Sequence, residues 1–284
     1  MADKSDRSCP VPFGHYAPSP FQSRLIALGH AMPGTWIGRR VASLIRSILR
    51  RWSEQPVDAL RLGSRMRLHP RGNACEKRLM TSPQFFDAVE LKLLDAMLAP
   101  GFVFLDIGAN VGAYTLFVAN RVGRSGRIVA VEPHPTAIER LRCNLDLNGI
   151  DWVRIVPVAL TDRLGTLSLH INDRNVGGSS LSQVQVAGST TIEVPARTLW
   201  SLAKEEGLEK IDAIKVDVEG VEDRVLMPYF ENAPDRSWPR LLIIENNWKA
   251  WRGDLLGMLQ RLGYSTVAET VGNLVLQREN GTRS

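Results

Sequence analysis

One short stretch of the chain brings together residues that could bind a ligand. In "FLDIGANVGAYTLFVA", residues 104–119, an apolar run passes into Asp106, Gly108 and Gly112. The apolar residues before Asp106 do not alternate, which predicts a strand buried on both faces, and helical spacing resumes after the second glycine. Glycines at a strand-to-helix turn permit positive φ and close approach of a nucleotide-like ligand to free backbone amides. The third glycine of the dinucleotide fingerprint is missing, which disfavours a nicotinamide dehydrogenase.

Acidic residues recur at the ends of the predicted strands. Asp106, Glu132, Asp162 and Asp217 each lie at or just beyond the end of a different strand. Glu132 stands where an acid accepts hydrogen bonds from both ribose hydroxyls of an adenosine. Asp162 could accept a hydrogen bond from an adenine amino group. An acidic edge disfavours a phosphate ligand and favours a positively charged one, such as a sulfonium with an amino-acid tail.

The fourth predicted strand supplies the candidate catalytic residues. Lys215, Asp217 and Glu219 alternate in sequence, so we expect them to share one face near the end of this strand. Asp217 is the first candidate for an active-site acid and Glu219 for substrate contact. The alternative for Glu219 is that it caps the next helix.

A divalent metal ion is a further hypothesis for the same edge. The fifth strand ends in Glu245 and Asn246, and neighbouring strands are roughly 5 Å apart, so both residues could approach Asp217. Carboxylate and amide oxygens suit a hard ion such as Mg²⁺. The alternative, which we favour, is that Glu245 and Asn246 bind substrate or cap a helix without metal.

The order of predicted elements indicates an α/β fold. Strands that alternate with helices imply right-handed crossovers and a parallel sheet that binds ligands at its carboxyl ends. Two further strands read as a partly exposed inserted pair, and a hairpin closes the chain. The predicted buried strands are residues 102–105, 127–132, 152–160, 211–217 and 240–245, the inserted pair is 165–171 and 191–196, and the hairpin is 264–269 and 273–277.

Over about residues 86–246 the chain resembles the FkbM family of S-adenosylmethionine-dependent methyltransferases. The resemblance rests on "FVFLDIGANVGAYTLFVA", "VEPHP", "NLDLNG", "VALTD", "GGSSL" and "IKVDVEGVEDRVL", which occur in this order. It implies a class I methyltransferase (Rossmann-like) sheet of seven strands, the last of them antiparallel. It also implies transfer of a methyl group to a hydroxyl of a sugar, glycan or related metabolite.

The resemblance also assigns cofactor contacts. Carried over by position, the methionine portion of S-adenosylmethionine would contact Asp106, Gly108, Asn110 and Gly112, the ribose Glu132, and the adenine side Asp162. One position departs from the family pattern. Where the family usually has Leu-Asp before the helix that precedes the fourth strand, this chain has Leu199-Trp200.

Composition and charge divide the chain into a basic N-terminal extension, residues 1–80, and a methyltransferase domain, residues 81–284. The extension holds 14 Lys and Arg residues against five Asp and Glu, whereas the domain is slightly acidic. Three widely spaced cysteines argue against a disulfide framework and fit a reducing compartment. Because there is neither a signal peptide nor an apolar span, we expect a cytoplasmic protein. Residues 1–23, rich in Pro and Ser, read as mobile, and residues 57–82 predict short strands and turns.

Residues 36–52 predict an amphipathic helix in the extension. Ile37, Val41, Leu44, Ile45, Ile48 and Trp52 fall on one face, and Arg39, Arg40, Arg46, Arg50 and Arg51 on the other. Such a helix usually docks on its own domain, which is the interpretation we favour. The alternative is peripheral contact with an anionic membrane.

Two other functions compete with O-methylation. The pI of about 9.3 suggests a nucleic-acid methyltransferase, but the turn after the fourth strand reads Asp217-Val218-Glu219-Gly220, whose acids would repel phosphate. A non-catalytic cofactor-binding scaffold would not require the polar cluster at this turn. Specificity for a small-molecule or glycan acceptor should lie in residues 57–85, in the loop 175–183 and after Glu245. The residues give no indication of the oligomeric state.

Overall fold

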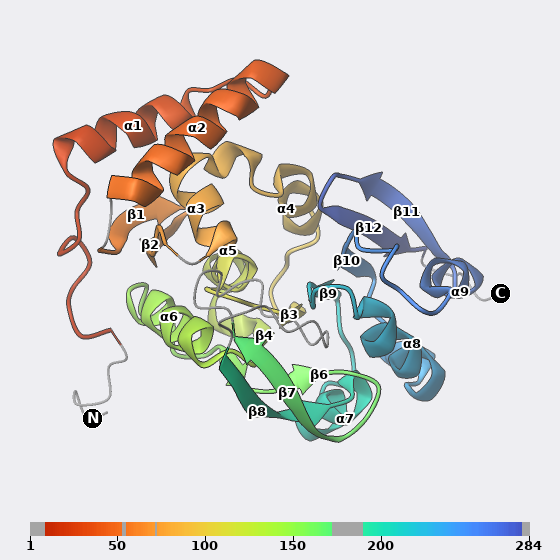
Figure 1. Cartoon of the computed structure of the whole chain (residues 1–284). Coiled ribbons are helices and arrows are strands. Elements are labelled where there is room, and N and C mark those ends of the chain that lie inside the picture. Colours follow the sequence, from red (N-terminus) through yellow and green to blue (C-terminus); the bar gives the residue numbers. More distant parts are fainter. Residues whose placement is uncertain (1–8, 53–54, 72, 172–189, 280–284) are drawn as a thin grey trace.

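The computed structural model describes residues 9–52, 55–71, 73–171 and 190–279 (Figure 1). Its main sheet has seven strands in the order β11-β12-β10-β9-β3-β4-β5, and β12 runs antiparallel to β10. This is the predicted α/β sheet with its antiparallel last strand. The strands are β3 (Val103–Ile107), β4 (Arg127–Val131), β5 (Arg154–Val156), β9 (Ala213–Val216), β10 (Leu241–Glu245), β11 (Tyr264–Glu269) and β12 (Asn273–Arg278).

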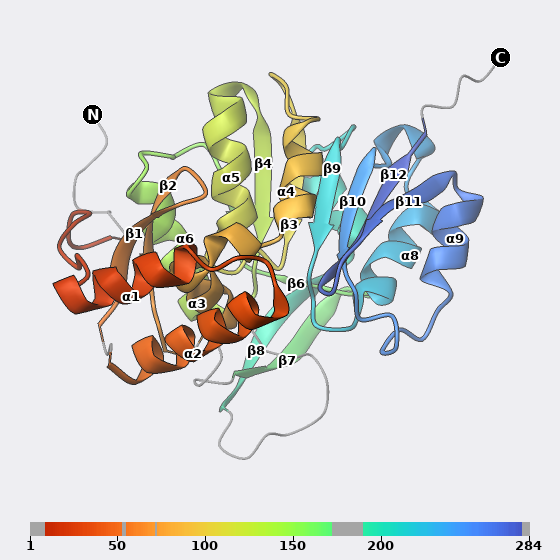
Figure 2. The ribbon, with the colours of Figure 1, turned by 90° about the horizontal axis from the view of Figure 1, so that it is seen from above.

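The central strands are buried on both faces, as their unbroken apolar sequences predict. Phe104 packs into the core on one face, and its neighbour Leu105 packs into the core on the other. Figure 2 shows the strands between two helical layers, with α4 and α5 on one side and α8 and α9 on the other. The helices of the domain are α4 (Ala88–Asp95), α5 (Ala113–Val122), α6 (Pro135–Asp146), α7 (Leu199–Glu205), α8 (Glu222–Asn232) and α9 (Leu255–Arg261).

The chain order makes β3 and β9 the switch point of the sheet. From β3 the chain proceeds to β4 and β5 on one side, and it later returns to β9 on the other side of β3. Ligands of open α/β sheets bind in the crevice where the strand order reverses. The site is therefore expected where β3 ends at Ile107 and β9 ends at Val216.

The expected third strand, residues 152–160, is two strands instead of one. β5 joins the main sheet, whereas β6 (Ala159–Leu160) pairs with β8 (Thr190–Arg197) in a small sheet. Pro157 lies between them and has no N–H to continue a ladder, which explains the interruption. β7 (Gly165–Ile171) pairs antiparallel with β8, which confirms the predicted inserted pair. The predicted specificity loop 175–183 lies outside the described residues.

The N-terminal extension folds as two helices, a hairpin and a short helix over one face of the domain (Figure 1). The prediction of strands and turns over residues 57–82 is only partly right, because the last part of this segment is helical. Asn73 accepts a hydrogen bond from the Glu76 amide and so starts the unpredicted helix. These elements are α1 (Pro20–His30), α2 (Trp36–Trp52), β1 (Val57–Arg61), β2 (Ser64–Leu68) and α3 (Ala74–Thr81).

Residues 9–19, which precede α1, are anchored to this hairpin, which differs from the prediction of a mobile segment; residues 1–8 of that predicted segment lie outside the described residues. The buried carboxylate of Asp58 accepts hydrogen bonds from the amides of Gly14 and Tyr16 and pairs with Arg67 at 2.8 Å. Arg67 in turn donates to the carbonyl oxygens of Val11 and Pro12. One buried ion pair therefore organises the N-terminal segment.

The expectation of no disulfide is also wrong, because the sulfurs of Cys9 and Cys143 are bonded. Cys143 lies on α6, and the anchored N-terminal segment brings Cys9 to it across 134 positions of sequence. The third cysteine, Cys75, is a free thiol. Sequence spacing could not reveal this pairing, because it depends on how the extension docks.

The amphipathic helix α2 presents a different face to the protein than its sequence suggests. It packs on α1 and α3 through Ala42, Ile45 and Leu49, which are buried. Ile37 and Leu44, expected on the packed face, are 67% and 62% exposed. Within the described part of the chain, no helix is both long enough and apolar enough to cross a bilayer.

Candidate functional site

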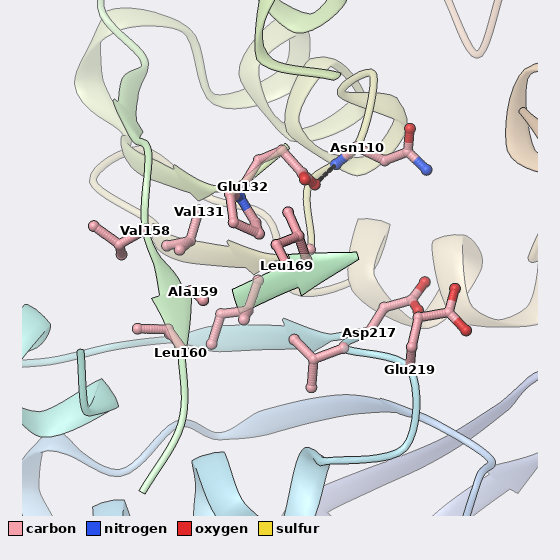
Figure 3. A pocket seen from close by; sticks show the side chains of 13 residues that line it. Asn110, Val131, Glu132, Val158, Ala159, Leu160, Leu169, Asp217 and Glu219 are labelled. Atoms are coloured by element: carbon pink, nitrogen blue, oxygen red, sulfur yellow. Dashed lines mark hydrogen bonds between the residues drawn. The ribbon is translucent and has the colours of Figure 1, made fainter. Parts of the chain in front are cut away.

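A cavity lies at the predicted edge of the sheet, beyond the ends of β3, β4 and β9 (Figure 3). About 610 Å³ of space, open solvent included, lies within its lining. Its polar lining includes Glu132 on one side and Asp217 and Glu219 on the other (Figure 3). Its apolar wall is formed by Ile107, Val131, Val158, Ala159, Leu160 and Leu169.

Two glycines shape the turn beneath this cavity, as predicted. Gly108 has a φ of 75°, and a Cβ at this position would overlap the carbonyl oxygen of Asp217. Gly112 has a φ of 89° and begins α5, where a Cβ would overlap Leu141. Any side chain here would push the turn away from β9 or α6. Glycine is therefore required at both positions by close packing as well as by backbone conformation.

Glu132 is held at the cavity wall by backbone amides. Its two carboxylate oxygens accept hydrogen bonds from the amides of Asn110, at 2.8 Å, and His134, at 2.9 Å (Figure 3). Burial raises the pKa of Glu132 to about 7, although both amides favour the charged form. Each oxygen retains a lone pair, so the fixed carboxylate can accept two hydrogen bonds from a vicinal diol.

Asn110 joins the glycine turn to the N-terminal extension. It adopts a left-handed conformation with a φ of 51°, which is uncommon for residues other than glycine. Its side-chain oxygen accepts a 2.7 Å hydrogen bond from the amide of Asn73, which is fully buried. Asn73 also caps the start of α3, so this one residue contacts both that helix and the glycine turn.

Asp106 lies below the turn and is almost completely buried. One carboxylate oxygen accepts hydrogen bonds from the amide and hydroxyl of Thr115 and so connects the first turn of α5 to the end of β3. The other oxygen is buried without a hydrogen-bond partner. Burial raises the pKa of Asp106, although the nearby Lys215 opposes this shift. An unpartnered buried carboxylate oxygen is suited to a cationic ligand group.

A second cavity adjoins the first and shares part of its wall. Four residues line both cavities, namely Gly108, Asn110, Asp217 and Glu219. About 760 Å³ of space, open solvent included, lies within the lining of the second cavity. Its remaining wall comes from α3, the start of α4, α5 and the ends of β3, β9 and β10, through Ala74, Cys75, Arg78, Phe86, Asp87, Asp106, Ala109, Ala113, Tyr114, Lys215 and Glu245.

The predicted catalytic residues meet at the shared wall, but they are not all on one strand. β9 ends at Val216, and Glu219 lies in the following turn with a φ of 57°. The ammonium of Lys215 donates a 2.8 Å hydrogen bond to Asp217. Burial lowers the pKa of Lys215, but Asp217 and Asp106 outweigh this effect and raise it above its ordinary value. The ammonium of Lys215 is therefore charged.

Glu219 does not serve as the helix cap that the alternative interpretation expected. The N-cap of α8 is Val221, which makes no side-chain cap hydrogen bond. The carboxylate of Glu222 accepts hydrogen bonds from the amides of Val218 and Gly220, in the turn before the helix. The carboxylate of Glu219 instead points beside that of Asp217 (Figure 3). Burial, followed by repulsion from Asp217, raises the pKa of Glu219 to about 7. At neutral pH this carboxylate can gain or lose a proton.

In the hypothesis of a metal ion at Asp217, Glu245 and Asn246, two of the ligand oxygens, Oε2 of Glu245 and Oδ1 of Asn246, are buried without a hydrogen-bond partner, but no wider ligand cluster accompanies them in the described part of the chain. The described residues contain no group of three or more His, Cys, Asp or Glu residues placed to hold one. The Asn246 amide turns toward the closing hairpin and donates to the carbonyl of Thr270. Glu245 does line the second cavity, and burial together with Asp217 raises its pKa well above its usual range. A protonated Glu245 can donate a hydrogen bond to a ligand.

Asp162 lies apart from the first cavity. It lines a neighbouring groove and forms an ion pair with Arg224 at 3.0 Å. Arg224 lowers the pKa of Asp162. The contact of Asp162 with an adenine therefore stays a prediction, which requires the carboxylate to turn toward the cavity.

The methyltransferase FkbM domain model matches residues 106–266, which is more than half of the chain. The chain belongs to the FkbM family. Members of this family are S-adenosylmethionine-dependent methyltransferases. The match includes Asp106, Glu132 and Asp217, and it ends on β11.

Three curated FkbM-type relatives are similar over parts of the chain. The 2-O-methyltransferase NoeI of Sinorhizobium fredii is 31% identical over 49% of this chain and 61% of its own length. The 31-O-demethyl-FK506 methyltransferase FkbM of Streptomyces tacrolimicus is 27% identical over 69% of this chain and 85% of its own length. The methyltransferase sdnD of Sordaria araneosa is 28% identical over 43% of this chain and 58% of its own length. The chain thus spans about six-tenths of the lengths of NoeI and sdnD.

Solved methyltransferase structures resemble the FkbM domain distantly. A methyltransferase from Geobacter sulfurreducens has 19% identity and a TM-score of 0.41, with 90% of this chain and 96% of the other covered. A Streptococcus mutans protein, described as a putative methyltransferase in complex with SAH, has 10% identity and a TM-score of 0.41. That similarity covers 68% of this chain and 97% of the other.

Two parts of the FkbM site were not found from sequence, and one departure from the family is explained. The apolar wall at Val158–Leu160 was taken only as a strand, and Asn73 lies in a helix that was not predicted. At the family's Leu-Asp position, Leu199 is buried in the core and Thr198 caps α7 by accepting a hydrogen bond from the Ser201 amide. Here the cap therefore does not need an acid at residue 200.

Proposed function

We propose that this protein is an O-methyltransferase that acts on a hydroxyl group of a sugar, glycan or related metabolite. The observation that carries the proposal is the wall shared by the two cavities, made of Gly108, Asn110, Asp217 and Glu219. A methyl donor in one cavity and an acceptor in the other would meet at this wall. The names of the relatives NoeI and FkbM, both of which specify O-methylation, support the choice of an oxygen acceptor.

The first cavity fits S-adenosylmethionine. Glu132 offers two oriented carboxylate oxygens to the ribose hydroxyls, and the apolar wall of the cavity beside it suits an adenine ring. Asp106 lines the adjoining second cavity, into which the methionine portion would extend past the shared wall, and its unpartnered oxygen suits the ammonium of that portion, directly or through a water molecule. Bound there, the cofactor supplies a methyl group on a positively charged sulfur.

The second cavity has the chemistry expected of a site for a polyhydroxylated acceptor. Its carboxylates at Asp87, Asp217 and Glu245 can accept hydrogen bonds from hydroxyl groups or, when protonated, donate one. Phe86 and Tyr114 add aromatic surface, against which the apolar face of a sugar ring can pack. The ammonium of Lys215 fixes Asp217, so that its orientation does not depend on the acceptor.

Glu219 is the best candidate for the general base. Its raised pKa matches the working range of a base at neutral pH, and its position on the shared wall brings it to the acceptor hydroxyl. In the proposed reaction the carboxylate of Glu219 takes the hydroxyl proton while the oxygen bonds to the methyl carbon and the carbon–sulfur bond breaks. Asp217, held by the hydrogen bond from Lys215, binds the acceptor.

A direct test measures S-adenosylhomocysteine release by the purified full chain with pools of monosaccharides, oligosaccharides and polyhydroxylated metabolites, followed by mass spectrometry of the acceptor. We expect release that depends on the acceptor and a product heavier by one methylene unit. Glu219→Gln should lower turnover by about 10²–10⁴ but retain cofactor binding in a calorimetric titration.

The other possible functions give different outcomes in this test. Tight cofactor binding without transfer to any hydroxyl compound would favour the scaffold interpretation. Methylation of RNA or DNA in place of these pools would establish a nucleic-acid methyltransferase. Activity abolished by EDTA and restored by Mg²⁺ would revive the metal at Glu245.

A further inference from the structure

One side of helix α2 exposes large apolar side chains to solvent. Trp36, Ile37 and Leu44 are 70%, 67% and 62% exposed. Positions 37 and 44 are two helical turns apart on one face of α2. Trp36 lies at the edge of this face, one turn before Arg40, which covers its ring. The opposite part of the apolar sector, at Ala42, Ile45 and Leu49, is buried against the rest of the protein. The helix is therefore packed on one side only, and its apolar surface extends beyond what packing requires.

The same surface carries arginines, and neither of its two helices contains an acidic residue. Residues 20–52, which span α1 and α2, contain six arginines and no Asp or Glu. In the described structure Arg39 contacts the carbonyl of Gly34 and the ring of Phe85, and Arg40 lies over the ring of Trp36. These contacts orient the guanidinium groups but leave their charge without a carboxylate partner. An anionic surface would supply the missing charge.

Helix α1 extends this surface. In both Figure 1 and Figure 2, α1 and α2 lie side by side at the periphery of the molecule. α1 itself exposes Phe21 and Leu28, 49% and 47% of whose surfaces reach solvent. Neither helix contains an acid in its first turn, where an acid is otherwise favourable. The two helices together form a basic surface with several large apolar side chains.

We propose that the α1–α2 surface docks on anionic lipid. Apolar side chains between arginines are the pattern of helices that lie in the membrane interface, with Trp as the usual interfacial anchor. A nucleic acid would use the arginines but would gain little from Ile37 and Leu44. A second copy of this chain would place like charges against each other, since the whole surface is basic.

Docking at this surface would bring the lipid close to the site. α3 packs against both α1 and α2, while Ala74, Cys75 and Arg78 of α3 line the second cavity. The side chain of Arg46 on α2 donates to Ser82, at the end of α3, which couples the docking helix to this wall. One helical layer thus lies between the proposed lipid surface and the second cavity. The proposal does not depend on which acceptor is methylated.

The test is co-sedimentation of the full chain with phosphatidylcholine vesicles, with and without phosphatidylglycerol. We expect binding that requires phosphatidylglycerol and weakens as salt increases. Arg39→Gln with Arg40→Gln should weaken binding by about fivefold for each removed charge. Ile37→Ser with Leu44→Ser should weaken it by more than about tenfold while net charge is unchanged. All four side chains are exposed, so the fold should persist, which a thermal melt verifies.

Matched controls separate this surface from overall charge and hydrophobicity. Arg236→Gln with Arg240→Gln removes the same charge from an exposed segment at the other end of the chain. Leu164→Ser with Val271→Ser removes exposed apolar side chains elsewhere. Both controls should bind vesicles like the wild type.

Three results would overturn the proposal. The first is no binding to phosphatidylglycerol vesicles at low salt. The second is equal loss of binding in the α2 variants and in their controls, which would reveal only a general charge effect. The third is binding to duplex or single-stranded RNA that the Arg39 and Arg40 changes weaken while vesicles do not bind, which would identify a nucleic-acid surface instead.

Discussion

The side chains of Asn73 and Asn110 are joined by a 2.7 Å hydrogen bond between two parts of the chain that differ in composition and charge. Asn73 belongs to the basic N-terminal extension and begins α3, while Asn110 belongs to the glycine turn beneath the cofactor cavity. Because the Asn110 amide also donates to Glu132, the extension is connected in two steps to the proposed ribose ligand. The extension is thereby part of the site.

This connection predicts that Asn73→Ala impairs both folding and cofactor binding. Loss of the helix cap should cost about 1 kcal/mol of unfolding free energy. Loss of the bond to Asn110 should in addition loosen a residue with positive φ and weaken S-adenosylmethionine binding several-fold. Urea unfolding measures the first effect and isothermal titration calorimetry the second.

Thr198→Ala is the matched control for this prediction. Thr198 caps α7 by the same type of hydrogen bond, but it does not line either cavity. It should lose a similar unfolding free energy with no change in cofactor affinity. If both variants bind the cofactor like the wild type, Asn73 is a helix cap only.

The sheet and the acidic edge could be predicted from sequence because their signals are local. Unbroken apolar runs such as that around Leu105 are buried on both faces, and the acid that follows such a run reaches the ligand edge by topology alone. Glu132 and Asp217 were found in this way. Gly108 could be inferred from its place at a turn, although the carbonyl of Asp217 that crowds it could not.

The missing features depend on tertiary contacts. α3 has only eight residues, and its start at Asn73 is fixed partly by Asn110, which is 37 positions away. The solvent exposure of Leu44 follows from how α2 docks, because its apolar sector is wider than the surface it covers. The positive φ of Glu219 likewise has no signal in residue type, since such a conformation is rare for glutamate.

The fixed carboxylate of Glu132 predicts a large effect on cofactor binding. Glu132→Ala removes two hydrogen bonds to a charged acceptor, each of which contributes roughly 1.5–3 kcal/mol. S-adenosylmethionine affinity should therefore fall by at least about a hundredfold, as measured by calorimetry. Glu231→Ala, on the exposed part of α8, serves as the control. Unchanged affinity of the Glu132 variant would remove this residue from the site.

Burial of Glu132 also predicts how stability depends on pH. Its pKa is about 7 in the folded protein and 4.5 as the reference value, so the folded state holds an extra proton between these values. The unfolding free energy contributed by this group is then largest below about pH 4.5 and falls as pH rises to 7. The shift corresponds to about 3 kcal/mol.

Glu132→Gln cannot lose this proton, so its unfolding free energy should fall less than that of the wild type between pH 5 and pH 8. Urea denaturation of the cofactor-free protein at both pH values measures the difference. Parallel changes in the two proteins would show that the carboxyl is not protonated on folding.

The proposed general base predicts the pH profile of the reaction. With a pKa of about 7 for Glu219, kcat/KM should increase from acid pH and level off above neutrality, because only the carboxylate accepts the hydroxyl proton. Glu219→Gln should lower kcat by about 10²–10⁴ and remove the dependence near pH 7. A variant that is slow but keeps the acid limb would identify another residue as the base.

The Cys9–Cys143 bond predicts that oxidised protein is more stable than reduced protein. Cross-links over long separations restrict the unfolded chain, and this one spans 134 positions, so its removal should cost about 2–4 kcal/mol of unfolding free energy. Cys9→Ser should melt at the same temperature with and without dithiothreitol, while the wild type should melt at a lower temperature after reduction. Thiol titration in denaturant provides the check, with one reactive thiol, that of Cys75, before reduction and three after it. Three thiols before reduction would show that the bond does not form.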